Sequence, residues 1–211
     1  MMRKFLLLSF SILLGSGSLI GCSSSGTTSG DLSINDNVFV GEALRTNAEL
    51  VDPVSDETSS IANKLIQSAN SGQNAVGLAA PQIGIGKSVF VYRVPERING
   101  DVIFPEEWEV AINATYEPAS DEIVLMPEGC FSVPHFYSRS VPRYKEIHYS
   151  YFTLDGTKVE GTARGSKAQI IQHETDHLNG ILYIDKLDDV GSLGKLSELK
   201  QLKSNKSNLK Q

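Results

Sequence analysis

The sequence predicts an α+β domain that contains antiparallel or mixed β-sheets and few helices. Strand-like segments follow one another between residues 88 and 152, separated by polar and glycine-containing turns. Asp155-Gly156 lies between two such segments, 149–154 and 157–161, and is typical of a hairpin turn. A helix is expected at about residues 167–179, where Gly180 would end it.

The remaining elements follow in chain order. A helix is expected to begin near residues 55–57, because apolar residues at 61, 62, 65, 66 and 69 follow helical spacing. The turn-forming segment 71–74 would end it. The best strand candidate is 88–94, and weaker candidates lie at 110–113, 122–126 and 146–152.

Composition excludes several classes of protein. The chain has 211 residues, of which 40% are hydrophobic and 21% charged, and these values exclude a disordered chain and a multi-span membrane protein. Its net charge of −6 argues against nucleic-acid binding, which usually requires a basic surface. The 2 cysteines cannot form a disulfide framework, so Cys22 and Cys130 each need a separate explanation.

The first 21 residues are predicted to be a signal peptide that lies outside the fold. Arg3 and Lys4 precede an apolar run and then small residues, which is the order found in secretory signal peptides. From residue 5 to residue 20 a helix would extend about 24 Å, whereas the hydrocarbon core of a bilayer is roughly 30 Å thick. A cleaved segment is therefore favoured over a transmembrane helix.

Cys22 ends the segment LIGC, which resembles the lipobox of bacterial lipoproteins, where lipid is attached to the cysteine after the cleavage point. A flexible polar tether at 22–37 would then lead to a catalytic domain at 38–189. We expect an extracytoplasmic protein that is held at the membrane by lipid on Cys22. An ordinary signal peptide is one alternative. A wrongly assigned start codon, which would leave a cytoplasmic protein, is the other.

Residues 190–211 are predicted to be a basic, partly helical tail. Leucines at 193, 196, 199 and 202 recur every three residues and would lie on one gradually rotating helical face. We favour a terminal helix packed on the domain over a helix lying on a membrane surface.

His173 and His177 form an H-E-x-x-H motif with Glu174. Two histidines four residues apart lie on one face of a helix, so both imidazoles can bind one metal ion. Glu174 can point at the open coordination position and take a proton from water there. Apolar neighbours at 168, 170, 171, 178 and 181 predict a buried helix, in which such polar side chains need a partner such as a metal.

A third protein ligand would leave one coordination position open for water. Cys130 is a better candidate than His135 or His148, which have no obvious partner in the sequence. A thiolate beside two imidazoles makes a soft, electron-rich site that is compatible with ferrous iron, zinc, nickel or cobalt. The structural alternative for Cys130 is a small buried hydrophobe.

Three segments, in order along the chain, resemble the three motifs of peptide deformylases. They are VGLAAPQIG at 76–84, EGCFS at 128–132 and QHETDH at 172–177. The resemblance extends from about residue 44 to residue 187. It implies the fold of that family, in which antiparallel or mixed sheets surround the metal-binding helix. It also implies a monomeric, metal-dependent hydrolase that releases formate from N-formylmethionyl peptides.

The resemblance implies roles for four residues at the metal. Cys130, His173 and His177 would hold one divalent ion, for which ferrous iron is usual in the family. Glu174 would act as general base during the attack of water and then pass the proton to the departing amine.

The resemblance also implies contacts with the substrate. The side-chain amide of Gln82 and the backbone N–H of Phe131 would bind the developing oxyanion. The peptide would pair with backbone groups like an added strand, and apolar side chains would surround its methionine. The residues expected in these contacts are Val76, Gly77, Gly129 and Ile170.

Three features depart from the family pattern. Ala75 stands where the family usually has glycine, beside the substrate channel. Gln169 stands where the family often has arginine or an aliphatic residue, which would alter the preference around the substrate side chain. The third departure is the signal peptide, because deformylases usually meet nascent chains in the cytoplasm or in an organelle.

Two other functions remain as alternatives. One is a lipid-anchored metallopeptidase, which would need a further downstream ligand, and Glu198 is the only glutamate after the motif. The other is a non-catalytic lipoprotein that binds formylated peptides, although such a protein would have no need of the general base Glu174.

Overall fold

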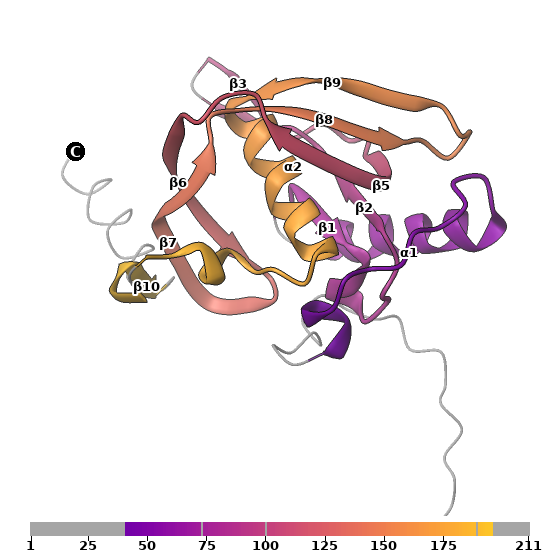
Figure 1. Cartoon of the computed structure of the whole chain (residues 1–211), viewed down its shortest axis with the longest axis horizontal. Coiled ribbons are helices and arrows are strands. Elements are labelled where there is room, and N and C mark those ends of the chain that lie inside the picture. The colour runs from indigo at the N-terminus through magenta and orange to yellow at the C-terminus, as the bar shows by residue number, and fades with distance from the viewer. Residues whose placement is uncertain (1–40, 73, 100, 189, 196–211) are drawn as a thin grey trace, which may run out of the picture. The chain divides into compact units, whose positions relative to one another are not determined.

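The computed structural model describes residues 41–72, 74–99, 101–188 and 190–195. Within these residues the chain forms helices α1 (Asp56–Ser71) and α2 (Gly165–Leu178) and three β-sheets (Figure 1). The strands are β1 (Gly77–Ala79), β2 (Val89–Tyr92), β3 (Glu96–Ile98), β4 (Asp101–Ile103), β5 (Glu109–Pro118), β6 (Ile123–Cys130), β7 (Val133–Tyr144), β8 (Glu146–Phe152), β9 (Lys158–Arg164) and β10 (Leu193–Lys195). The predicted α+β class is confirmed.

The largest sheet is antiparallel and has the strand order β1-β2-β5-β8-β9. The predicted hairpin joins β8 to β9, and Gly156 there has a φ of 79°, a left-handed conformation that favours glycine. Asn113 sits at an irregularity between β5 and β8. Its side chain hydrogen-bonds both the N–H and the C=O of Val51, at 3.0 and 2.8 Å, and so fastens the segment before α1 to the sheet.

A three-stranded antiparallel sheet, β10-β7-β6, forms the other wall of the domain. Its strand β7 was not predicted. Leu193 was expected on a helical face, and this expectation is wrong: it pairs with Ser138 in β10 and packs against the cluster around Leu182. Backbone pairing and apolar burial in the sheet therefore override the helical spacing. Residues 196–211 lie outside the described residues.

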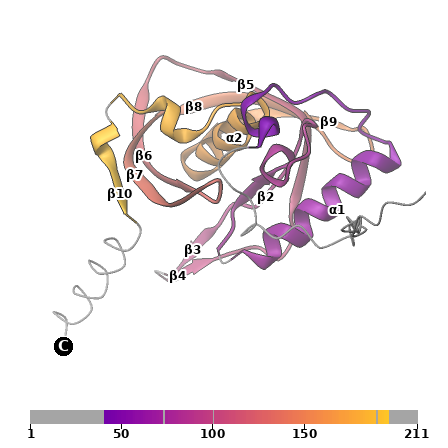
Figure 2. The ribbon, with the colours of Figure 1, turned by 90° about the horizontal axis from the view of Figure 1, so that it is seen from below.

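Helix α1 begins and ends as predicted. The hydroxyl of Ser55 accepts a hydrogen bond from the backbone N–H of Thr58 at 3.2 Å, which caps the helix N-terminus. Ile61 and Leu65 are buried in the cluster that also contains Val89 and Val91 of β2. Figure 2 shows α1 beside β2, with the hairpin of β3 and β4 nearby.

Helix α2 is the centre of the domain, where it packs against strands of both larger sheets (Figure 1). It begins two residues earlier than predicted, at Gly165. It ends before Gly180, as expected; a Cβ at Gly180 would lie 2.8 Å from the backbone of Arg45. Ala168, Ile171 and Leu178 are buried on α2 together with polar residues of its H-E-x-x-H motif.

Candidate metal centre

The three predicted metal donors come from two elements that the fold brings together. His173 and His177 lie one turn apart on α2, with ring centroids 4.9 Å apart. Cys130 is the last residue of β6, and its Sγ lies 3.3 Å from Nε2 of His177. One donor atom from each residue lies within 4.8 Å of the other two. A soft thiolate and two imidazoles at this separation fit a divalent transition-metal ion.

His173 is held by a carboxylate that the sequence did not single out. Nδ1 of His173 lies 2.9 Å from Oε2 of Glu128. An ionised carboxylate can only accept, so Nδ1 donates and Nε2 is left free as a metal ligand. Burial opposes ionisation of Glu128, but hydrogen bonds from Arg143 and His173 outweigh it and lower its pKa to about 2.

Arg143 is buried, and its guanidinium group pairs with two buried carboxylates. It donates two hydrogen bonds to Glu128, at 2.7 and 2.8 Å, and a third to Asp176 of α2. Asp176 also accepts from Tyr116 and pairs with Lys186. The network ties β6, β7 and α2 together behind the metal donors. The signal in the sequence was an acidic residue inside each motif: Glu128 two residues before Cys130, and Asp176 directly before His177.

Glu174 is buried and aims at the same space. Its Oε2 has no hydrogen-bond partner among the described residues, and burial raises its pKa to about 7. A Cβ at Gly77 would lie only 2.2 Å from Oε1 of Glu174. Glycine at position 77 therefore gives this carboxylate its room, and a carboxylate with a pKa near neutrality can both accept and release a proton.

Gln82 is fixed in one orientation on the 3-10 helix η3 (Ala80–Ile83). Its Oε1 accepts from the backbone N–H of Ala79 at 2.8 Å. Its Nε2 therefore points away from that contact and lies 3.4 Å from Sγ of Cys130 and 3.2 Å from Oγ of Ser132. A buried amide held in this way is a preorganised hydrogen-bond donor beside the metal donors.

A pocket of about 420 Å³ opens at this site. The wall formed by α2 includes Gln169 and runs to Glu174. The opposite walls come from residues 74–77 and 127–131. The catalytic and metal-binding residues Gln82, Cys130, His173 and Glu174 line this pocket. So do all of the other residues predicted to contact substrate, which are Val76, Gly77, Gly129, Phe131 and Ile170. His177 lies behind them, fully buried.

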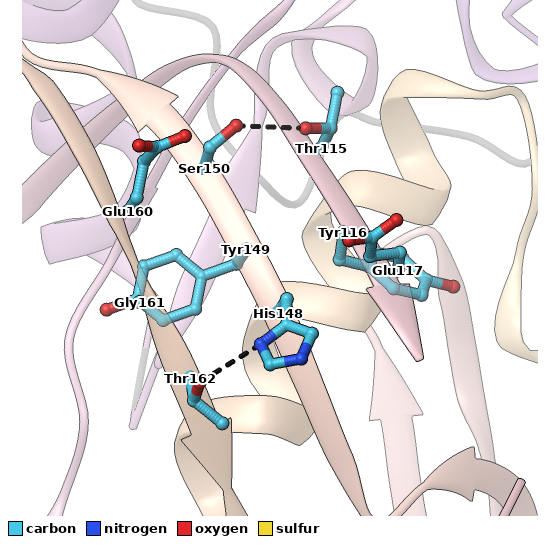
Figure 3. A pocket seen from close by; sticks show the side chains of 9 residues that line it. All are labelled: Thr115, Tyr116, Glu117, His148, Tyr149, Ser150, Glu160, Gly161 and Thr162. Carbon is cyan, nitrogen blue, oxygen red and sulfur yellow. Dashed lines mark hydrogen bonds between the residues drawn. The ribbon is translucent and has the colours of Figure 1, made fainter. Parts of the chain in front are cut away.

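A second and wider hollow, of about 550 Å³, lies over β5, β8 and β9 (Figure 3). His148 stands in it, and its Nδ1 lies 3.0 Å from Oγ1 of Thr162 on the neighbouring strand. The lining residues come from these three strands alone, so His148 is not part of the metal centre. His135 has a φ of 72° and is exposed, and it does not line the metal pocket either.

The predicted signal peptide and lipid attachment site fall on residues 1–40, which are outside the described residues. In the part of the chain that is described, neither α1 nor α2 has the length and apolar character that a membrane-crossing helix requires.

Comparison with known proteins points to one family. The sequence model of the polypeptide deformylase family matches residues 36–192. The chain is 38% identical over 149 residues to a peptide deformylase of Chromohalobacter salexigens, covering 71% of this chain and 82% of that one. It is 35% identical over 152 residues to a peptide deformylase of Treponema pallidum, covering 72% and 86%.

Solved structures give the same result. A class I type b peptide deformylase from Acinetobacter baumannii with bound Met-Ala-Ser matches with a TM-score of 0.61 and 33% identity, covering 69% of this chain and 92% of that one. A peptide deformylase from Synechococcus elongatus in complex with actinonin matches with a TM-score of 0.61 and 32% identity, covering 71% and 78%.

Proposed function

The chain belongs to the peptide deformylase family, and we propose which of its residues carry out the reaction of that family. It is a metal-dependent hydrolase that removes the formyl group from N-terminal N-formylmethionine and releases formate. The observation that carries the assignment of residues is the meeting of Cys130, His173 and His177 with the unpartnered carboxylate of Glu174 in one pocket.

Cys130, His173 and His177 would hold one divalent ion, which we propose is Fe²⁺, with Zn²⁺, Ni²⁺ and Co²⁺ as substitutes that suit the same donors. When bound, the ion supplies a Lewis acid that polarises the formyl carbonyl and makes water more acidic. Glu128 keeps His173 in the tautomer that such an ion requires.

Glu174 acts as the general base. Its carboxylate takes a proton from the attacking water, whose oxygen adds to the formyl carbon. The C–N bond then breaks, and Glu174 delivers the proton to the departing amine nitrogen, so that formate and a free amino terminus leave. The raised pKa of Glu174, about 7, suits a group that must accept and release one proton in each turnover.

Hydrogen-bond donors and apolar side chains around Glu174 bind the substrate. Nε2 of Gln82 and the backbone N–H of Phe131 stabilise the negative charge that develops on the formyl oxygen. The peptide pairs with the backbone near Gly77 as an added strand. Val76 and Ile170, which pack in one apolar cluster, receive the methionine side chain. All of these groups come from one chain, so we propose that the enzyme acts as a monomer.

Formate release tests the proposal. The full chain, purified without oxygen and loaded with Fe²⁺ or Ni²⁺, is expected to release formate from formyl-Met-Ala-Ser. Cys130→Ala is expected to lose both metal and activity. Absence of formate release from the metal-loaded wild type would contradict the proposal. A metallopeptidase or a non-catalytic binder would give that result.

We also propose that Cys22 carries lipid and places the enzyme outside the cytoplasm. The order of basic, apolar and small residues before Cys22 supports this location. Fractionation of cells that express the wild type or Cys22→Ala provides the test. Membrane-bound wild type beside a released or unprocessed variant is expected, and recovery of both from the cytosol would contradict the location.

A further inference from the structure

One face of α2 forms a wall of the catalytic pocket. Ile170 and Gln169 line it three and four residues before His173, and four residues extend about 6 Å along a helix. The proposed function puts the formyl carbon beside His173 and Glu174, so a substrate side chain that follows this wall of the pocket would reach Gln169.

A third and smaller cavity, of about 240 Å³, lies on the far side of Gln169. Of the described residues, Gln169 is the only one that lines both this cavity and the catalytic pocket. Val124 and Met126 of β6 give this smaller cavity apolar walls. Its other lining residues are Arg143, Tyr144, Lys145, Arg164 and Gly165.

The amide of Gln169 is held across the boundary between the two spaces. Its Nε2 donates to the backbone C=O of Pro127 at 2.8 Å, and so joins α2 to β6. Oε1 of Glu128 lies 3.4 Å from the same nitrogen. Glu128 is itself fixed by Arg143, so the amide has a rigid partner on the opposite wall. An aliphatic residue at position 169 would make neither hydrogen bond.

We propose that Gln169 is a specificity-determining residue that limits the pocket to side chains of about the length of methionine. The inference rests on the proposed function of the pocket and concerns which formylated residue enters it. Removal of the Gln169 side chain joins the two spaces. The cavity behind Gln169, of about 240 Å³, gives room for the added methylenes of a longer apolar chain, which would lie against Val124 and Met126.

Two substrates that differ only in length test the proposal. They are formyl-norleucine-Ala-Ser and its analogue with 2-aminodecanoic acid, whose side chain is longer by four methylenes. The wild type is expected to prefer norleucine in kcat/KM by about tenfold or more, because pocket length discriminates between chains. Gln169→Ala is expected to reduce this preference by about tenfold, mainly through a higher kcat/KM for the long substrate.

The matched control is Gln67→Ala, which removes the same side chain from an exposed position on α1 and is expected to leave the preference unchanged. Gln169→Ser serves as a second small variant if the alanine variant does not fold. Equal kcat/KM of the wild type for both substrates would overturn the proposal. So would a Gln169 variant that loses activity on both substrates in the same proportion.

Binding of the deformylated tripeptides gives a readout that does not depend on turnover. Calorimetry with norleucine-Ala-Ser and its long analogue is expected to show that only the position-169 variants bind the long peptide as well as the short one. If neither the wild type nor any variant releases formate, the proposed function fails. The peptide affinities then decide by themselves whether Gln169 limits the length of the bound side chain. An unchanged ratio of affinities would overturn this role.

Discussion

The metal pocket and the hollow over β5, β8 and β9 differ in what surrounds their polar groups. The hollow over β5, β8 and β9 is the larger, at about 550 Å³ against about 420 Å³ for the metal pocket (Figure 3). Its polar side chains stand on open strands and pair with their neighbours, as His148 does with Thr162 and Thr115 with Ser150 at 3.1 Å. Water can satisfy any remaining donors and acceptors there.

In the metal pocket, polar groups are buried and incompletely paired. Glu174 is 3% exposed, and its Oε2 has no hydrogen-bond partner in the described part of the chain, while its neighbour His173 is oriented by the buried pair of Glu128 and Arg143. Buried polar groups are costly unless something binds them. Burial combined with unmet bonding capacity therefore distinguishes the catalytic hollow, whereas size does not.

The largest expected effect is that of Glu174→Gln. The amide keeps the volume of the side chain but cannot take the proton from water, so kcat is expected to fall by about 10³-fold. Metal content, measured by atomic absorption, is expected to stay at one ion per chain. Substantial turnover by the variant would remove the general-base role from Glu174.

Gly77→Ala tests the close contact behind the general base. The added Cβ would lie 2.2 Å from Oε1 of Glu174, so the carboxylate must move. A displacement of about 1 Å at a catalytic group costs about 10²-fold in rate, and kcat is expected to fall by that amount with metal retained. Gly86→Ala is the control, because a Cβ there would meet nothing within 4 Å and Gly86 does not line the metal pocket. An equal fall in kcat in the two variants would show that the close approach of Gly77 to Glu174 has no special role in catalysis.

Glu128→Ala tests the support of His173. It leaves Arg143 buried without its main partner, which is expected to reduce the free energy of unfolding by roughly 3–5 kcal/mol. Loss of the hydrogen bond to Nδ1 of His173 is expected to weaken metal binding by about 10–100-fold.

Glu146→Ala provides the surface comparison for Glu128→Ala. Glu146 pairs with Arg164, whose side chain is 72% exposed, so water replaces the lost partner. Urea unfolding and a competitive chelator titration are expected to show much smaller changes than for Glu128→Ala. Similar losses in both variants would show that burial is not what gives the Glu128 pair its importance.

His148→Ala is expected to have the smallest effect. His148 stands in the larger hollow and is exposed, so its loss is expected to change stability by less than about 0.5 kcal/mol and kcat/KM by less than about twofold. A marked fall in kcat/KM, measured by formate release, would show that the larger hollow also serves the reaction.

Local pattern accounts for the elements that the sequence predicted well. Ser55 caps α1, and the apolar spacing after it sets the buried face of that helix. The Asp155-Gly156 turn specifies the β8–β9 hairpin within a few residues. Strand β7 was missed because its buried positions do not alternate regularly along the strand and two prolines interrupt it, and its 12-residue length comes from pairing with β6 on one side and β10 on the other.

The sequence by itself determined the chemistry of α2, because a spacing of four residues places His173 and His177 on one helix face wherever the helix lies. Three co-ordered motifs then indicated Cys130 and Gln82 by resemblance. Only the tertiary structure decided what holds and bounds these groups. Arg143 reaches Glu128 across a β6–β7 pairing, and Gln169 joins α2 to Pro127. Such contacts depend on the packing of elements distant in sequence, for which a local pattern carries no signal.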